Sequence, residues 1–297
     1  MEVFSNIVKE IQRSLMMSSQ GLRNLRVPSF IEKQKELILR RFKKIKYKIL
    51  IGSGKGGVGK SFIAANLAVA LTMFGKKVGI LDADFHGPDI PKILGLRGTP
   101  LLASPQGIIP VTSRDGIKVV SLDFMLPDDE TPIIWRGPLK ISAIRQLLGE
   151  VNWGELDYFI VDLPPGTGDE PLSVAQEMPN PSGIILVTLP SEVSLLDVKR
   201  AAGFAKKLNL PILGIVENMS YYKCPKCGHV DYVFGKGGGE FLAKHLNVDL
   251  LGKIPLSSKI AEANDKGIPF VKAYANEEGA KEILKIAEKI VKKLEES

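Results

Sequence analysis

The chain has few cysteines, few histidines and no long apolar run. Its 297 residues include two cysteines and three histidines, too few cysteines for the disulfide framework of a small secreted domain. No segment approaches the roughly 18 consecutive apolar residues of a membrane-spanning helix. The N-terminus, Met1–Phe4, lacks the basic and then apolar regions of a signal peptide. We therefore expect a cytoplasmic protein without a transmembrane helix.

Basic charge is concentrated at the start of the chain. The net charge is +7, and residues 1–48 hold twelve Lys and Arg against four Asp and Glu. The other 249 residues carry 28 basic and 29 acidic groups, so they are nearly neutral. Such an extension could contact nucleic acid, a membrane surface or an acidic protein. We favour two solvated amphipathic helices packed on the body, and expect neither a membrane nor a nucleic acid as partner.

Apolar runs of strand length alternate with helical patterns from residue 47 onward. This alternation predicts an α/β fold with a mostly parallel sheet covered by helices on both faces. The predicted strands are 47–52, 78–81, 118–122, 158–161, 183–188, 212–217 and 251–254. The predicted helices are 1–17, 29–44, 61–74, 138–148, 194–207, 237–246 and 277–295. The last helix carries an apolar stripe, which predicts core packing: Ile283, Ile286, Ala287, Ile290, Val291 and Leu294.

A phosphate-binding loop follows the first of these strands. The sequence there is Gly54, Lys55, Gly56, Gly57, Val58, Gly59, Lys60 and Ser61. A strand before the loop and a helix after it are the context that this pattern requires. Glycines let successive backbone N–H groups point at a phosphate, and the helix N-terminus adds partial positive charge. We expect ATP here, with Lys60 on the β- and γ-phosphates and Ser61 on Mg²⁺.

Two other predicted strands end in acidic residues. Asp82 and Asp84 follow the strand 78–81, and Asp162 follows the strand 158–161. Ligands bind in the crevice at the carboxyl ends of parallel strands. Since Asp82 and Asp84 are two residues apart, we expect one to support its loop and the other to face the nucleotide. Asp162 has the form of a Walker B carboxylate, which accepts hydrogen bonds from Mg²⁺-bound water.

The loop carries a second lysine, Lys55, and in this it resembles the deviant Walker A motif of the MinD-like ATPases. That group includes septum-site and partitioning ATPases, the nitrogenase iron protein and the Mrp/ApbC iron–sulfur carriers. The resemblance implies that Lys55 reaches the nucleotide of a second subunit and that Asp84 positions the attacking water. It also places Asp82 near the Mg²⁺ shell, and Asn218 and Pro255 at the adenine base.

The cysteine motif Cys224-Pro-Lys-Cys227-Gly-His229 narrows the resemblance to the Mrp/ApbC family of iron–sulfur cluster carrier ATPases. The resemblance covers residues 46–297 and leaves 1–45 as a basic helical extension. Some relatives carry a cysteine-rich segment at this end, but residues 1–45 contain no cysteine, so no cluster is expected there. We expect His229 to lie outside the metal ligands.

Two thiolates are too few for a metal site that takes four ligands. A symmetric homodimer would supply four, and the family resemblance implies a bridging [4Fe–4S] cluster that passes to apoproteins from a donor scaffold. We interpret the chain as an ATP-hydrolysing cluster carrier. Two alternatives remain open: a partitioning-type positioning ATPase without metal, and a zinc-bridged ATPase dimer without a carrier role. A redox C-x-x-C is disfavoured, because the pair does not open a helix.

Overall fold

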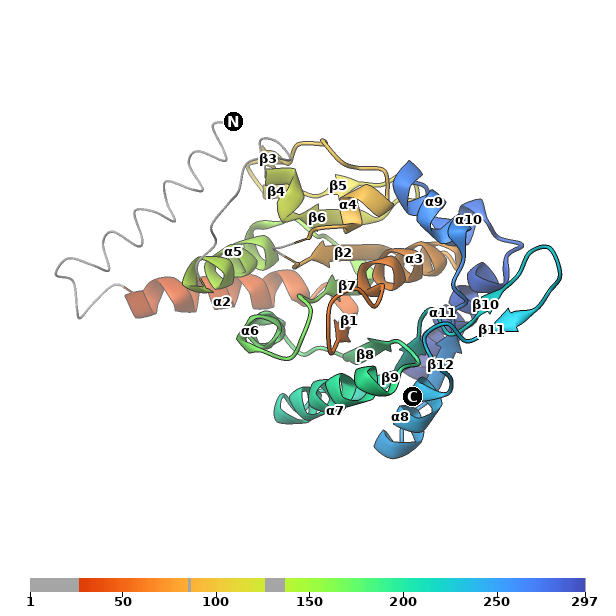
Figure 1. The fold of residues 1–297 in the computed structure, drawn as a ribbon. Coiled ribbons are helices and arrows are strands. Elements are labelled where there is room, and N and C mark those ends of the chain that lie inside the picture. Colours follow the sequence, from red (N-terminus) through yellow and green to blue (C-terminus); the bar gives the residue numbers. More distant parts are fainter. Residues whose placement is uncertain (1–26, 85–86, 126–136, 297) are drawn as a thin grey trace.

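The computed structural model describes residues 27–84, 87–125 and 137–296. Its centre is an eight-stranded sheet with the order β12-β9-β8-β1-β7-β2-β6-β5 (Figure 1). All neighbouring strands are parallel except β5, which runs antiparallel to β6 at the edge. The strands are β1 (Ile45–Ser53), β2 (Val78–Asp82), β5 (Val111–Thr112), β6 (Lys118–Ser121), β7 (Leu156–Asp162), β8 (Gly183–Thr188), β9 (Ile212–Glu217) and β12 (Leu250–Lys253).

Helices cover both faces of the sheet, as the alternation of strands and helices predicts. One face packs against α3 (Lys60–Met73), α4 (Ile90–Ile93), α9 (Ser258–Lys266), α10 (Phe270–Ala273) and α11 (Glu278–Glu295). The other packs against α2 (Val27–Phe42), α5 (Gly137–Glu150), α6 (Asp169–Glu177), α7 (Glu192–Lys207) and α8 (Gly238–Leu246). A short 3₁₀ helix, η1 (Leu122–Met125), follows β6.

Alternation along each strand divides the core between the two faces. In β1, Ile49 and Ile51 belong to the core on the α3 side, whereas Leu50 belongs to the core on the α5 side. The side-chain period of a strand is two residues, so a continuous apolar run fills both layers. This is why the central strands are apolar throughout.

The two terminal helices of the described chain pack on the body. The stripe predicted for α11 is confirmed, because Ile283, Ile286 and Ile290 are buried on the α3 side of the sheet. Helix α2 buries Ile38 and places Phe42 against Phe159 of β7 with ring centroids 5.0 Å apart. The predicted helix 1–17 lies outside the described residues, and the boundary at residue 45 stays a prediction.

Several short elements were not predicted from the sequence. They are α4, α6, α9, α10, η1 and β5, and two hairpins formed by β3 (Leu102–Ser104) with β4 (Gly107–Ile109) and β10 (Tyr222–Lys223) with β11 (Val230–Asp231). The seven predicted strands and six of the seven predicted helices are present within a few residues of their expected bounds. No helix within the described residues is long and apolar enough to cross a membrane.

Candidate nucleotide site and cysteine arm

The phosphate loop joins the end of β1 to the start of α3. Gly57 and Gly59 have φ angles of 74° and 82°, in the left-handed region that glycine adopts without steric cost. Inside the turn, the Ser53 hydroxyl donates to the Lys55 carbonyl at 2.9 Å. The loop therefore has the backbone shape of a phosphate cradle, and α3 begins at Lys60.

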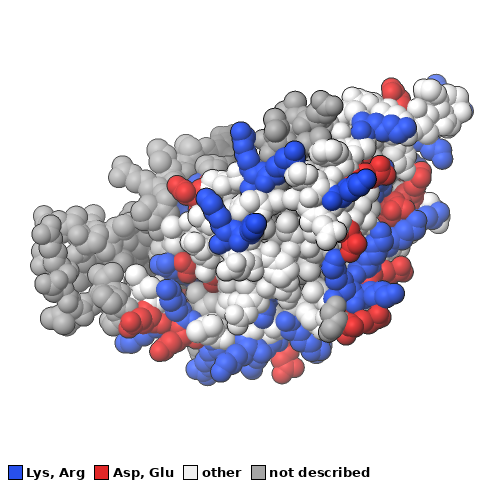
Figure 2. Space-filling model, turned by 90° about the horizontal axis from the view of Figure 1, so that it is seen from below, with Lys and Arg blue, Asp and Glu red and all other residues white. Residues whose placement is uncertain are grey.

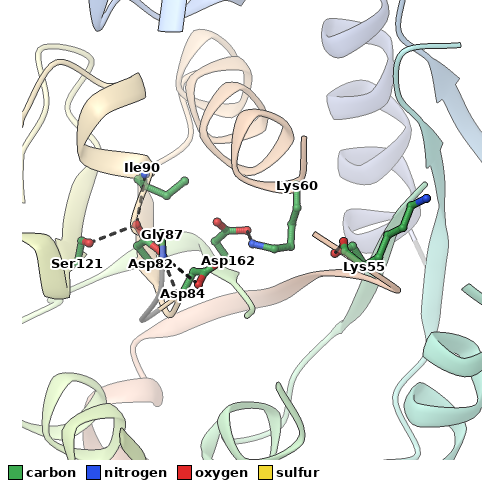
Figure 3. Close-up of polar contacts among 9 residues, drawn as sticks. Lys55, Lys60, Asp82, Asp84, Gly87, Ile90, Ser121 and Asp162 are labelled. Carbon is green, nitrogen blue, oxygen red and sulfur yellow. Dashed lines mark hydrogen bonds and ion pairs between the residues drawn. The ribbon is translucent and has the colours of Figure 1, made fainter. Parts of the chain in front are cut away.

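Lys60 contacts Asp162 at the centre of this site (Figure 3). Its Nζ donates to Asp162 Oδ1 at 2.6 Å, and the two side chains are 6% and 0% exposed. Burial raises the pKa of Asp162 above its ordinary value, although Lys60 opposes this shift. The second oxygen, Asp162 Oδ2, is buried and has no hydrogen-bond partner. An unpartnered buried carboxylate oxygen at this edge is suited to a further donor, such as a metal-bound water.

Asp82 supports the loop that follows β2. One oxygen accepts from the backbone N–H of Asp84 and the other from that of Ile90, both at 3.2 Å. The hydroxyl of Ser121, the last residue of β6, also donates to it at 3.2 Å (Figure 3). The pKa of Asp82 is raised well above its ordinary value, mainly because the carboxyl group is completely buried and secondly because the Asp162 carboxylate is near. Its contacts are those of a loop-supporting residue.

Asp84 and Lys55 occupy opposite sides of the Lys60–Asp162 pair in Figure 3. Asp84 is 9% exposed, and its Oδ1 accepts from the Gly87 N–H at 3.3 Å. The Lys55 side chain, in contrast, points away from Lys60 and Asp162. The site residues are nevertheless gathered at the carboxyl ends of the strands, which we call the nucleotide edge, because β1, β2 and β7 end in register there. They are Lys55, Lys60, Asp82, Asp84 and Asp162.

Asn218 lies directly beneath the phosphate loop. It follows β9, it is 3% exposed, and its Nδ2 donates to the Val58 carbonyl at 2.8 Å. Its Oδ1 is buried without a hydrogen-bond partner. Pro255, the other residue expected at the base, is buried and lines a cavity of about 360 Å³ together with Tyr222 and Cys224. The Asn218 Oδ1 atom could therefore accept a hydrogen bond from a ligand, whereas its Nδ2 group already donates to the phosphate loop.

The two cysteines lie on a separate projection, residues 221–237, which we call the cysteine arm (Figure 1). Between strands β10 and β11, the Cys224 N–H donates to the His229 carbonyl at 2.8 Å, and the Gly228 N–H donates to the Cys224 carbonyl at 2.9 Å. Both thiols are free, Cys224 half-buried and Cys227 exposed. Backbone N–H groups of Cys227 and then Lys226 lower the pKa of the Cys224 thiol, which favours the metal-binding thiolate.

One chain alone does not complete a metal site on this arm. Nowhere in the described parts of the chain do three or more His, Cys, Asp or Glu side chains gather as potential ligands. The arm also exposes apolar side chains close to the cysteines: Tyr222, Val230, Tyr232, Val233 and Phe234. Two open thiols beside an exposed apolar surface are suited to a partner that brings further ligands.

Comparison with known proteins places the chain in a family. A family model described as "ParA: NUBPL iron-transfer P-loop NTPase" matches residues 44–291. The chain belongs to this family. It is also 56% identical over 255 residues to the iron-sulfur cluster carrier protein of Saccharolobus solfataricus, and the match covers 86% of each chain.

Solved structures agree with this assignment of the P-loop NTPase. A nucleotide-binding protein of Archaeoglobus fulgidus in complex with ADP, in which cobalt was found, is 42% identical with a TM-score of 0.72. That match covers 83% of this chain and 95% of the other. The cell division ATPase MinD of Pyrococcus furiosus is 28% identical with a TM-score of 0.62, covering 83% and 98% of the two chains. The predicted MinD-like fold is confirmed.

Two buried polar side chains near the site were not predicted from the sequence. One is Ser121, which bonds Asp82, and the other is Glu217, a fully buried acid at the end of β9. Both follow the same rule that identified Asp82 and Asp162, namely a polar residue at the carboxyl end of an apolar strand. Applying that rule to every predicted strand would have found them.

Surface charge on one face of the NTPase is mixed in sign. Figure 2 shows mostly Lys and Arg over the upper middle of this face, and Lys and Arg interspersed with Asp and Glu along its lower and right-hand margins. A nucleic-acid-binding surface typically gathers basic residues in one continuous patch. Over the described residues, uncharged surface separates the basic groups on this face from one another.

Proposed function

We propose that this P-loop NTPase binds and hydrolyses ATP and carries a [4Fe–4S] cluster between two copies of the chain, for transfer to apoproteins. The main support is the cysteine arm, because it presents two open thiols without a third ligand in the described chain. A second copy would bring the total to four, the number that such a cluster takes. The S. solfataricus relative is named as an iron-sulfur cluster carrier.

The carboxyl ends of β1, β2 and β7 carry donors and acceptors that fit ATP and Mg²⁺. The Lys60 ammonium group now contacts Asp162, and it would exchange this contact for the β- and γ-phosphates when ATP binds. Ser61, the proposed Mg²⁺ ligand, is the next residue of α3. Asp162 Oδ2 would then accept from water on the Mg²⁺, and Asn218 Oδ1 from the adenine amino group. When bound, Mg²⁺ neutralises phosphate charge. Gly54, Gly56 and Asp82 shape the cradle, and Pro255 lies beside the base.

Replacing Asp84 by alanine should leave nucleotide binding intact and reduce hydrolysis. Asp84 is nearly buried at the nucleotide edge, where we propose that it orients the attacking water. Loss of a group that positions or accepts a proton typically lowers a rate by about 100-fold or more. Steady-state phosphate release and fluorescent-nucleotide titration measure the two effects. Asp249→Ala, which removes an acid paired with Lys293, is the control, and wild-type hydrolysis by the Asp84 variant would refute this role.

Replacing Lys55 by alanine should affect hydrolysis more than binding. Its side chain points away from the nucleotide edge of its own chain, as a lysine that acts on a second subunit would. We expect hydrolysis to fall about tenfold, and the Kd for Mg-ADP to change less than about threefold, because only the closed dimer loses a charge contact. Equal losses in binding and hydrolysis, or a nucleotide-bound dimer with Lys55 in solvent, would contradict the proposal.

A transfer experiment tests the carrier function. The full-length protein is reconstituted anaerobically with iron and sulfide, separated from free iron, and mixed with an apoprotein whose activity requires a [4Fe–4S] cluster. We expect activation of the apoprotein and a matching loss of the carrier's thiolate-to-iron absorbance. Stoichiometric zinc with no iron uptake would favour the zinc-bridged dimer, and no metal at all the positioning ATPase. We place the protein in the cytoplasm, with a cluster-donor scaffold as its other partner.

A further inference from the structure

A buried acid, Glu217, connects the two ends of the cysteine arm. It is the last residue of β9 and 0% exposed. One carboxyl oxygen accepts from the hydroxyl of Ser220, and the other accepts from the backbone N–H of Gly239 at 2.5 Å. Ser220 directly precedes the arm, and Gly239 lies in the first turn of α8, directly after it. One side chain therefore fastens both ends of the segment that carries Cys224 and Cys227.

Glu217 and Gly239 pack closely, so the hydrogen bond between them depends on glycine at this position. A Cβ atom at Gly239 would lie 2.8 Å from the Cβ of Glu217, which leaves no room for a larger residue. The backbone N–H of Ser220 also donates to the Ile254 carbonyl at 2.9 Å, and the Leu256 N–H donates to the Tyr221 carbonyl at 2.7 Å. The start of the arm is thus held by Glu217 and by the segment that follows β12.

The neighbouring residue, Asn218, connects the same turn to the phosphate loop. Its Nδ2 bonds the Val58 carbonyl, and a Cβ atom at Gly59 would lie 2.2 Å from that nitrogen. The loop therefore rests on Asn218 without space between them. Consecutive residues, Glu217 and Asn218, hold the arm on one side and the phosphate loop on the other.

We propose that Glu217 is a positioning residue that couples the phosphate loop to the cysteine arm. When a nucleotide enters, the loop amides turn toward its phosphates, and the Val58 carbonyl moves with them. Asn218 follows that carbonyl because the contact is close, and Glu217 transmits the movement to both ends of the arm. Coupling of this kind is reciprocal, so a metal bound to the arm changes nucleotide affinity by the same factor. The metal-binding role of the arm rests on the proposed function, but the linkage does not require it.

Hydrogen exchange on the metal-free protein tests the coupling. Full-length chains are compared with and without saturating Mg-ADP, and exchange is followed in peptides that span residues 221–237. In the wild type we expect the nucleotide to change exchange of the arm by roughly fivefold, within the usual range of allosteric coupling. The Cys224 and Gly228 amides report directly, because both are hydrogen-bonded within the arm.

Four variants separate coupling from a general structural role. Glu217→Ala removes the hydrogen bonds to Ser220 and Gly239, and Ser220→Ala removes the first of them. Each variant should therefore abolish the nucleotide-dependent change in exchange. Glu217→Gln should retain it, since its amide oxygen accepts from Gly239 while its NH₂ donates to the Ser220 hydroxyl. Ser113→Ala is the matched control, because Ser113 is a buried serine that bonds the amides of its own distant turn. It should also retain the full effect.

The proposal is overturned if Mg-ADP leaves the wild-type arm unchanged, if Ser220→Ala keeps the full effect, or if Ser113→Ala loses it. Circular dichroism establishes that each variant is folded, and if Glu217→Ala is not, Ser220→Ala and Glu217→Gln decide the matter. No iron is present in this experiment. A failure of cluster binding therefore leaves its result intact, and a failure of the coupling leaves the carrier function untouched.

Discussion

Replacing Lys60 by alanine should abolish nucleotide binding. The change removes the one cation that lies within hydrogen-bond distance of Asp162 at the described nucleotide edge, and with it the proposed contact to the β- and γ-phosphates. Hydrogen bonds between charged groups contribute about 1.5–3 kcal/mol each, so the loss of two such bonds raises Kd by more than about 100-fold. Isothermal titration with Mg-ADP and with a non-hydrolysable ATP analogue measures the effect.

A lysine at the amino end of a strand, opposite to the nucleotide edge, serves as the control. Lys76 precedes β2 and pairs with Glu295 at 2.7 Å, so Lys76→Ala removes the same charge without touching the loop. We expect its nucleotide affinity to remain within about threefold of the wild type, as is usual for a surface ion pair. Retention of near-wild-type affinity by a folded Lys60→Ala protein would show that this loop is not the nucleotide site.

Replacing either cysteine by serine should eliminate cluster binding. With Cys224→Ser or Cys227→Ser, a pair of chains offers two thiolates instead of four, too few to hold a [4Fe–4S] centre. We expect iron and sulfide to fall from about four of each per pair of chains to below about a tenth of that value. Nucleotide affinity, compared between the metal-free variant and the metal-free wild type, should be unchanged, because the phosphate loop is a separate part of the chain.

Lys226→Ala is the matched control for the cysteine variants. It alters the side chain between the two cysteines but keeps both thiols and the backbone N–H groups that lower the pKa of Cys224. This variant should bind iron as the wild type does. If a serine variant keeps its full iron content, the cluster is held elsewhere and the bridging site is refuted.

The sequence was sufficient for the sheet and for the positions of the main polar residues. The central strands are apolar throughout because both of their faces are buried, and this composition identifies them without tertiary information. The carboxyl ends of these strands then locate Asp82 and Asp162, since parallel strands bring their ends to one edge. The phosphate loop adds its own spacing of glycines and lysines.

The contacts between side chains within the site could not be predicted from the sequence. Lys60 pairs with Asp162 across 102 residues, and Asn218 bonds Val58 across 160; nothing in the local pattern of any one segment predicts such partners. Helix α6 was missed for a different reason. The residues before it, 164–168, are rich in proline and glycine, which is typical of a loop. The helix that begins at Asp169 is only nine residues long and has a proline in its first turn, a position that helices tolerate.

Native mass spectrometry of the anaerobically reconstituted protein tests the central claim most directly. We expect a species of two chains that carries one [4Fe–4S] cluster, together with cluster-free monomers, and no monomer with a cluster. Each cluster-bearing species should dissociate when the cluster is removed or transferred. A single chain that retains the cluster, or a dimer that retains only zinc, would contradict a cluster shared by the cysteines of two chains.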